Sequence, residues 1–309
     1  MRRVFLFVLS VSLSLCFQRG ASVRAADQQT QSSAPSNAPP AAAAAGNVGE
    51  EVCAACHTDE EKNFAANPHA RLALEHAGKG VTCESCHGPG QAHVEGGGDV
   101  KKIFRFTTAS AREVDEKCLS CHANAHPNFA HSPHGQAGVS CLSCHSVHHF
   151  TTESFLLKKD QPQLCYQCHA DIRVSFSMPF HHKVPEGLMK CTDCHDPHGS
   201  FERTNLRTTA DRNMICTRCH TETAGPFIYE HPVVKTGGCT TCHSPHGSPN
   251  PRLLLLSNVN TLCLQCHTAS MNFVEPGTPS FHNQNTQYVS CTSCHTQIHG
   301  SNASVVFFK

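Results

Sequence analysis

The sequence has few large apolar side chains for its length. Its 309 residues include no tryptophan and three tyrosines, and aromatic residues make up only 6% of the chain. A chain of this size normally buries many such side chains in its core. The composition therefore excludes an ordinary core made of polypeptide alone, and it predicts that something else fills the interior.

The chain also lacks an excess of charge of either sign. It contains 24 basic and 24 acidic residues, and no basic stripe stands out along it. This balance excludes nucleic acid as a partner. Beyond residue 17 there is no apolar run long enough to cross a bilayer, so the sequence predicts no transmembrane span of its own.

The first 25 residues have the features of an export signal. Arg2 and Arg3 precede an apolar run over residues 4–17, and a small-residue cleavage site ends at Ala25. Cleavage there removes four arginines and no acidic residue, which takes the formal net charge from 0 to −4. Residues 26–48, rich in Ala, Pro, Ser and Gln, predict a disordered tether.

Cysteine and histidine are abundant, with 21 and 25 copies, and every cysteine except Cys16 belongs to a C-x-x-C-H motif. Cysteines at i and i+3 lie on one face of a helical turn, with the histidine at i+4 beside them. Two thiols can then bond to the edge of one haem while the imidazole ligates its iron. The predicted thioether cysteines are Cys53, Cys56, Cys83, Cys86, Cys118, Cys121, Cys141, Cys144, Cys165, Cys168, Cys191, Cys194, Cys216, Cys219, Cys239, Cys242, Cys263, Cys266, Cys291 and Cys294. The predicted proximal iron ligands are His57, His87, His122, His145, His169, His195, His220, His243, His267 and His295.

Disulfides and zinc sites are the two other common uses of paired cysteines in an exported chain. Neither requires a histidine directly after every second cysteine, and here all ten pairs have one. The motifs therefore predict ten covalently attached haems c. The macrocycles would also supply the interior that the missing aromatic side chains leave unfilled.

The remaining histidines follow the motifs at regular spacing. After each odd-numbered motif a histidine comes 11 to 15 residues beyond the proximal one, and after each even-numbered motif it comes three to six residues beyond. We expect these ten histidines to occupy the distal iron positions. They are His69, His93, His134, His148, His182, His198, His231, His246, His282 and His299.

Two of these choices have a close competitor: His131 against His134, and His181 against His182. His134 has the more regular offset, and the "HKV" that begins at His182 matches the "HPV" at His231. Methionine ligands would raise the reduction potential, but the chain has enough histidines for every site. No motif is altered to mark an open coordination position, so the sequence predicts an electron carrier and no enzyme.

The reach of the chain limits which haem each distal histidine can serve. His195 and His198 are three residues apart, and three extended residues span at most about 11 Å. Two histidines on one iron need Cα atoms roughly 13 Å apart, given metal–nitrogen bonds of about 2 Å. His198 must therefore ligate a different haem from His195, and the same argument applies to His148 and His246. We expect the same of His93 and His299, where the chain could barely reach, so that these five histidines connect neighbouring haems.

The motifs come in five pairs with a repeat near 50 residues, which predicts a multihaem repeat protein. Short helices, much irregular chain and little sheet are expected, and an Asn or Asp in "ADRN" and "SNVN" is expected to cap the helix that follows. The predicted cytochrome domain covers residues 49–302, with a tail over 303–309. Its two-haem repeats lie near 49–110, 111–150, 151–200, 201–248 and 249–302.

The ten motifs behind an export signal, the "CHDPHGS" element and the ending "CTSCHTQIHGSN" resemble the DmsE/MtrA family of decahaem c-type cytochromes, over residues 51 to 302. The resemblance implies an elongated wire of ten haems c in the periplasm, associated with the outer membrane. It also implies docking in an outer-membrane β-barrel porin and electron exchange with partner cytochromes. A soluble periplasmic shuttle, or a multihaem reductase with one open haem, is the alternative.

Overall fold

The computed structural model describes residues 46–75, 80–151, 155–208, 211–267, 282 and 290–308. The chain divides into two units, Met1–Ala43 and Ala44–Lys309. The predicted export signal, and the predicted tether up to residue 45, lie outside the described residues.

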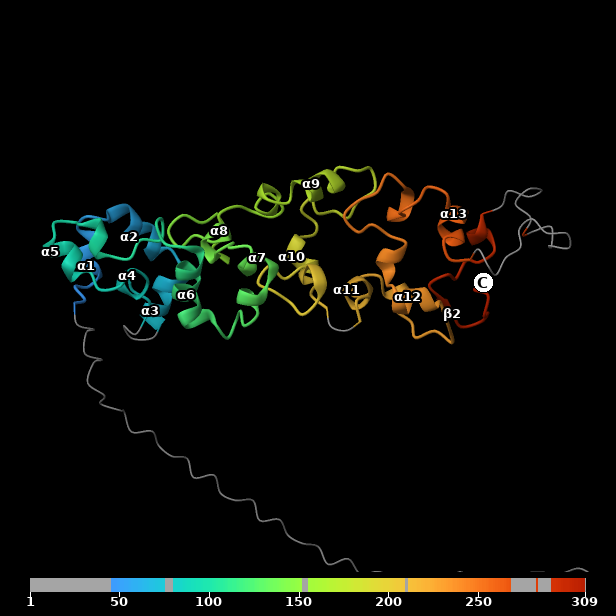
Figure 1. The fold of residues 1–309 in the computed structure, drawn as a ribbon, viewed down its shortest axis with the longest axis horizontal. Helices are drawn as coiled ribbons and strands as arrows, with labels where there is room; N and C mark the ends of the chain where they lie inside the picture. Colours follow the sequence, from blue (N-terminus) through green and yellow to red (C-terminus); the bar gives the residue numbers. More distant parts are fainter. Residues whose placement is uncertain are drawn as a thin grey trace, which may run out of the picture. The chain divides into compact units, whose positions relative to one another are not determined.

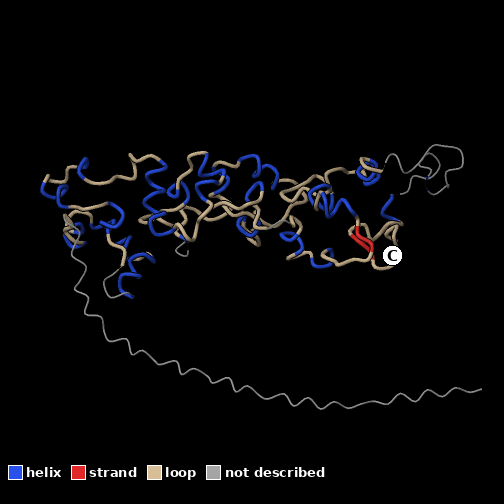
Figure 2. The backbone as a smooth tube through the Cα atoms, turned by 60° about the horizontal axis from the view of Figure 1, so that its bottom comes forward, coloured by secondary structure: helices blue, strands red, loops and turns tan. Residues whose placement is uncertain are grey.

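The second unit is built of short helices and irregular segments, as the sequence predicts (Figure 2). The described part contains thirteen α-helices of 4 to 12 residues, the longest being α6. Their bounds are α1 Glu50–Ala54, α2 Thr58–Ala65, α3 Pro68–Glu75, α4 Cys83–His87, α5 Gln91–Glu95, α6 Ala111–His122, α7 Pro133–Gln136, α8 Cys141–Cys144, α9 Ala170–Phe176, α10 Cys191–Cys194, α11 Met214–Thr217, α12 Pro232–Thr236 and α13 Val259–Leu264.

The described part also contains short 3₁₀-helices, one small sheet and four isolated β-bridges. Strands β1 (Tyr229–Glu230) and β2 (Gly300–Ser301) pair antiparallel, with Tyr229 opposite Ser301. No helix in these ranges is long and apolar enough to cross a membrane. The 3₁₀-helices are η1 Val100–Lys102, η2 Phe129–His131, η4 Cys165–Gln167, η5 Arg203–Asn205, η6 Thr221–Thr223, η7 Cys239–Thr241, η8 Pro251–Leu253 and η10 Cys291–Ser293.

Helix caps explain where several of these elements begin. The Ser110 side chain accepts the Glu113 backbone N–H at 3.3 Å while the Glu113 carboxylate accepts that of Ser110 at 2.7 Å, a capping box for α6. Asn258 caps α13 as predicted, whereas Asn213 before α11 makes no capping bond with its side chain. Helices this short are unstable alone and depend on their packing partners.

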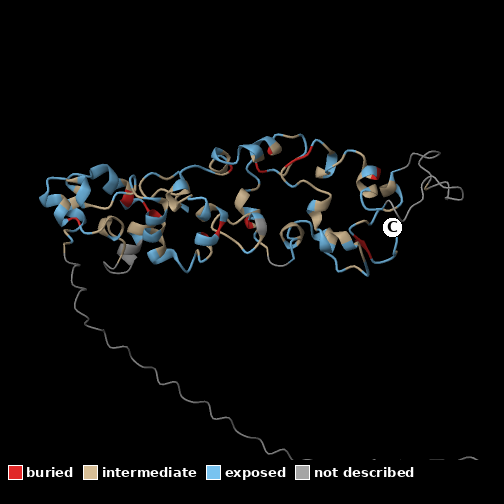
Figure 3. Ribbon diagram, viewed as in Figure 1, coloured by how far each residue is buried: buried red, intermediate tan, exposed pale blue. Residues whose placement is uncertain are grey.

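The polypeptide does not fill its own interior. Buried residues are few in the described part of the chain (red in Figure 3), and, proline apart, only five of them carry apolar side chains. The composition predicts this result, because the chain has too few aromatic residues for a larger core. The five are Phe64, Val114, Phe129, Phe176 and Val184.

Within the unit Ala44–Lys309, α1 and α5 lie near one end and α13 and β2 near the other, with α6 to α11 between them (Figure 1). Loops of one repeat pack against the backbone of the repeat before it. A Cβ atom at Gly247 would lie 1.9 Å from the carbonyl oxygen of Ser175, and one at Gly199 would lie 2.9 Å from that of Asn128. Glycine at these two positions is therefore required for the repeats to approach so closely.

Candidate haem-binding sites

Each CXXCH motif folds into one helical turn. Outside α4 and α6, which contain their motifs, the histidine backbone N–H donates to the carbonyl of the first cysteine, at 2.9 Å for His57 and 3.1 Å for His267. This turn brings both thiols and the imidazole close together on the chain. None of the twenty motif cysteines, all of which are described, forms a disulfide.

The structure places nine of the ten predicted distal histidines beside a proximal histidine. Two imidazoles on opposite faces of one iron have ring centres about 6 Å apart, because each metal–nitrogen bond is about 2 Å long. The observed ring-centre distances are 5.9 to 6.4 Å. The pairs are His93 with His57, His148 with His87, His69 with His122, His198 with His145, His134 with His169, His246 with His195, His182 with His220, His299 with His243, and His231 with His267.

These pairs interleave the repeats in two directions. A histidine that follows an odd motif meets the proximal histidine two motifs later, as His69 meets His122. A histidine that follows an even motif meets the one two motifs earlier, as His198 meets His145 and not the adjacent His195. His93 is the exception at the start of the chain, since it meets His57 of its own repeat.

The tenth pair, His282 with His295, stays a prediction. The segments on both sides of His282 lie outside the described residues. The ring of His295 packs against Phe308 at 4.9 Å, and the backbone N–H of Gln297 donates to the carbonyl of Phe307 at 2.9 Å. Residues of the predicted tail thus cover the last motif.

The competing histidines, His131 and His181, have different surroundings from the preferred His134 and His182. The rings of His134 and His182 lie beside proximal rings, whereas Nε2 of His181 lies 3.1 Å from the carboxylate of Glu186. His131 lies in η2, where its carbonyl accepts from Gln136.

His126 is a further ring near two sites. Its ring centre is 6.3 Å from that of His122 and 3.9 Å from that of His198. The backbone N–H of His126 donates to the carbonyl of His122 at 3.1 Å, so one helical turn connects the two residues. A turn this short cannot pass around the rim of a haem, and His126 therefore cannot face His122 across an iron.

Hydrogen bonds to Nδ1 orient the distal rings. Nδ1 of His134 donates to the carbonyl of Pro197 at 2.9 Å, and Nδ1 of His182 donates to that of Pro245 at 2.6 Å. In each case the acceptor is the residue just before the distal histidine of a later repeat. With its proton on Nδ1, each imidazole keeps the lone pair of Nε2 for a metal ion.

The proximal histidines of the even motifs are oriented in the same way by backbone carbonyls that the sequence did not indicate. Nδ1 of His195 lies 2.8 Å from the carbonyl oxygen of Thr204, and Nδ1 of His243 lies 2.8 Å from that of Arg252. Thr204 and Arg252 have φ values of 64° and 58°, in the left-handed region that non-glycine residues rarely adopt. Such strain, about 1–3 kcal/mol per residue, persists only where the surrounding structure holds it.

Burial lowers the pKa of six of the distal imidazoles and so favours their neutral form. It lowers the pKa of His198 to about 4, with the neighbouring His126 and His145 acting in the same direction. A neutral imidazole is the form that ligates a metal. Burial is the main cause of a lowered pKa in five other distal histidines as well: His69, His148, His231, His246 and His299.

The first thiols of paired motifs contact each other, as Cys165 does Cys191. Between pairs, the second thiols are neighbours: burial, and then the thiol of Cys168, raises the pKa of Cys144. Together these contacts place consecutive motifs next to one another through the unit. The same first-thiol contact joins Cys53 to Cys83, Cys118 to Cys141, Cys216 to Cys239, and Cys263 to Cys291.

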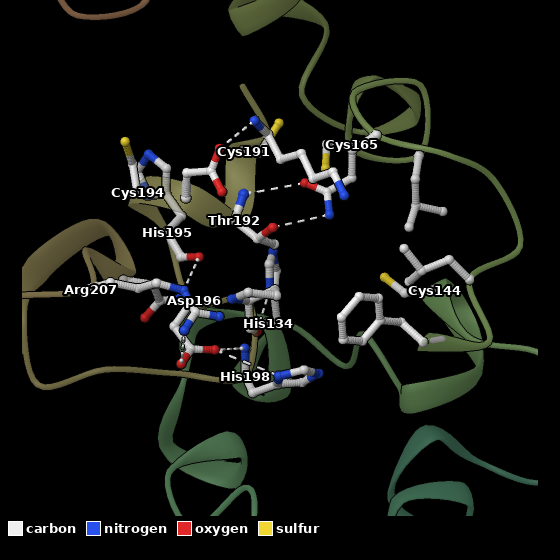
Figure 4. Close-up of a pocket in the computed structure, with 18 of the residues that line it drawn as sticks. His134, Cys144, Cys165, Cys191, Thr192, Cys194, His195, Asp196, His198 and Arg207 are labelled. Atoms are coloured by element: carbon white, nitrogen blue, oxygen red, sulfur yellow. Dashed lines mark hydrogen bonds and ion pairs between the residues drawn. The ribbon is translucent and has the colours of Figure 1, made fainter. Parts of the chain in front are cut away.

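One continuous cavity of about 5180 Å³ runs along the described part of the unit, and Figure 4 shows a part of it around Cys191 and His198. It is lined by residues of all ten motifs and by the nine paired distal histidines. Divided among ten motifs, this volume leaves each one a space in the range of about 300–1,000 Å³ that is typical of a cofactor pocket. The thiol pairs, the ring spacings and this space together fit haem c.

Two family models match segments that each contain two CXXCH motifs. A model described as "Doubled CXXCH motif" matches residues 131–174, 181–225 and 231–272. A model described as "Cytochrome c554 and c-prime" matches residues 93–146 and 254–296. The doubled-motif matches join each even motif to the odd motif that follows it, one motif out of phase with the predicted two-haem repeats. The cytochrome c554 matches cover the third with the fourth motif and the ninth with the tenth.

Three relatives illustrate the range of similar proteins. The multiheme cytochrome MtrA of Shewanella baltica is 34% identical over 82% of this chain and 79% of its own length. The cytochrome c-type protein NrfB of Escherichia coli is 32% identical over 41% of this chain and 68% of its own. The dissimilatory sulfite reductase MccA of Wolinella succinogenes is 24% identical over 54% of this chain and 27% of its own.

Repeated CXXCH turns, paired imidazoles and a continuous cavity define a multihaem c-type cytochrome, a protein that binds haem c and transfers electrons. The long match to MtrA narrows the class. The chain belongs to the MtrA family of multihaem c-type cytochromes.

Proposed function

We propose that this protein is a decahaem electron conduit between the periplasm and the cell exterior, associated with the outer membrane and docked in a β-barrel porin. The observation that carries the proposal is the interleaved set of nine histidine pairs at the spacing of two imidazoles on one iron. Similarity to MtrA of Shewanella baltica over most of both chains supports it.

In this proposal the ten CXXCH motifs hold ten haems, and each paired histidine is the distal ligand of its partner's iron. His282 is assigned to the iron of His295, because these two remain when the other nine pairs are formed. When bound, haem c supplies an iron that cycles between its ferric and ferrous states. Hydrogen bonds from Nδ1 hold several of these imidazoles, among them His134 and His195, and in this proposal a histidine takes the sixth coordination position of every haem.

The arrangement of the motifs favours a single series of sites. The thiol contacts join each motif to the next in chain order, as in the step from Cys144 to Cys168. Distal histidines also tie each repeat to its neighbours, since His134 serves the site of Cys165 from the repeat before it. Electron transfer between repeats therefore does not depend on a flexible hinge.

A reductase with one open haem is the second candidate function. The reason to keep it is the similarity to MccA, which is named as a sulfite reductase. An open haem binds carbon monoxide when it is reduced, whereas a haem with two histidines does not. Carbon monoxide binding by the purified protein therefore separates the two candidates.

The number of haems is the first testable consequence. We expect mass spectrometry of the denatured, processed protein to show the polypeptide plus ten haems, because every motif has both thiols and its histidine. Thioether bonds should keep all of them attached through acid–acetone extraction. Nine or fewer haems in a homogeneous preparation would show that at least one motif is not a site.

Transfer across a membrane is the second consequence. Liposomes that contain the cytochrome together with a candidate porin, and that enclose a redox dye, are expected to show dye reduction when dithionite is added outside. Liposomes with the porin alone are the control for leakage of dithionite. The conduit proposal fails if the cytochrome without porin, washed from the lipid surface, gives the same rate.

A further inference from the structure

One distal histidine has a carboxylate at the nitrogen that points away from the iron. Nδ1 of His198 lies 3.5 Å from Oδ1 of Asp196, and the same oxygen accepts the backbone N–H of His198 at 3.0 Å. Arg207 lies on the other side of this carboxylate, 3.8 Å from Oδ2. Figure 4 shows Asp196 between Arg207 and His198.

The corresponding nitrogens of other distal histidines face neutral backbone. Nδ1 of His93, His182 and His231 lies 3.0, 2.6 and 3.0 Å from a carbonyl oxygen. Among the nine paired distal histidines in the described part of the chain, only His198 has a carboxylate within 4 Å of its Nδ1.

The five repeats show that this acid is particular to one of them. The residue that directly follows the proximal histidine of an even motif is Gly88, Ser146, Asp196, Ser244 or Thr296. Arg207, whose backbone N–H donates to the carbonyl of Cys194, corresponds to Lys158 and Leu255, which donate to Cys144 and Cys242. Among the three even motifs compared, only the one at Cys191 and Cys194 has both the acid, Asp196, and the arginine, Arg207.

A carboxylate that faces the Nδ1–H of a metal-bound imidazole makes that imidazole a stronger electron donor to the metal. A stronger donor stabilises ferric iron over ferrous iron and lowers the reduction potential. A guanidinium on the far side of the carboxylate withdraws part of that effect, because it competes for the same negative charge.

We propose that Asp196 is a positioning residue that lowers the reduction potential of the haem attached at Cys141 and Cys144 by holding its carboxylate beside Nδ1 of the distal ligand His198, and that Arg207 limits this effect. The proposal rests on the proposed function, because it takes His198 as the ligand opposite His145. It makes the fourth haem a low-potential site within the series.

The test is a set of single variants of the full holoprotein, followed by potentiometric titration and by electron paramagnetic resonance of the ferric haems. Asp196→Asn should raise the midpoint of one haem in ten and change one low-spin signal. Arg207→Gln should lower the same midpoint. Ser244→Asp, which copies the acid into the next repeat beside His246, should lower the midpoint of a different haem.

Glu186→Gln is the matched control, because Glu186 contacts His181, a histidine that we do not assign to any iron. It removes one carboxylate beside one histidine and should leave every midpoint and every low-spin signal unchanged. Equal shifts of the haem midpoints in Glu186→Gln and Asp196→Asn would show that any lost surface charge has this effect, which would overturn the proposal.

A second background separates failure of this proposal from failure of the ligand assignment. Cys141→Ser with Cys144→Ser removes the haem in question, and Asp196→Asn should then shift nothing. A shift that persists there would mean that His198 serves another haem, which contradicts the assignment. No shift from Asp196→Asn or Ser244→Asp in the ten-haem protein would overturn the tuning role while leaving the assignment intact.

Discussion

Replacing His246 with alanine is expected to open the haem held by Cys191 and Cys194, although His246 directly follows the motif of Cys239 and Cys242 in the sequence. The ring of His246 lies 6.0 Å from that of His195, the proximal histidine of the earlier motif. The reduced variant should therefore bind one carbon monoxide per protein, whereas the unaltered protein should bind almost none.

Haem-deletion backgrounds identify which site has opened. Adding Cys191→Ser and Cys194→Ser removes the haem that His246 should serve, and carbon monoxide binding should disappear. Adding Cys239→Ser and Cys242→Ser should leave it in place. The reverse result would show that His246 ligates its neighbour in sequence, and His181→Ala serves as a control that opens no site.

Removing one haem from the middle of the series is expected to abolish most of the transfer from one end to the other. Cys165→Ser with Cys168→Ser deletes the fifth haem, whose motif lies between the thiols of Cys144 and Cys191. The remaining sites on either side are then separated by a gap, and electron tunnelling becomes steeply slower as distance grows. The liposome assay should show a large loss of rate.

Two measurements show that such a loss comes from the gap. Mass spectrometry should find nine haems, and the variant should still co-purify with the porin, so that docking is preserved. Dithionite in solution should still reduce all nine haems, since it reaches both sides of the gap. An unchanged rate across the membrane would mean that electrons bypass the fifth site, and the single-file proposal would be wrong.

The sequence by itself determined the class of the protein. Haem attachment is covalent and local, so that two cysteines and a histidine within five residues, such as Cys53, Cys56 and His57, are enough to indicate a site. The scarcity of aromatic residues predicted a polypeptide without its own core, and the structure, proline apart, buries only five apolar side chains in its described part. Short helices and little sheet followed from the same close spacing of motifs.

Spacing also selected the distal candidates, but it could not pair them. His148, His198 and His246 stand at the same distance from their own motifs, so nothing local distinguishes which iron each one faces. The length of the connecting chain excluded the haem of the preceding motif, but it did not identify which other haem each histidine ligates. The partners lie about one repeat of roughly 50 residues away, and only the folded chain brings His198 to His145.

The groups that orient the ligands were decided by tertiary structure alone. Acceptors such as the carbonyls of Thr204 and Pro245 have no signature, because every residue has a backbone carbonyl. Asp196 could be read in the sequence but not its role, which depends on His198 turning its Nδ1 toward the carboxylate. Motif chemistry is local and can be read from the chain, whereas orientation depends on contacts between distant residues that exist only after folding.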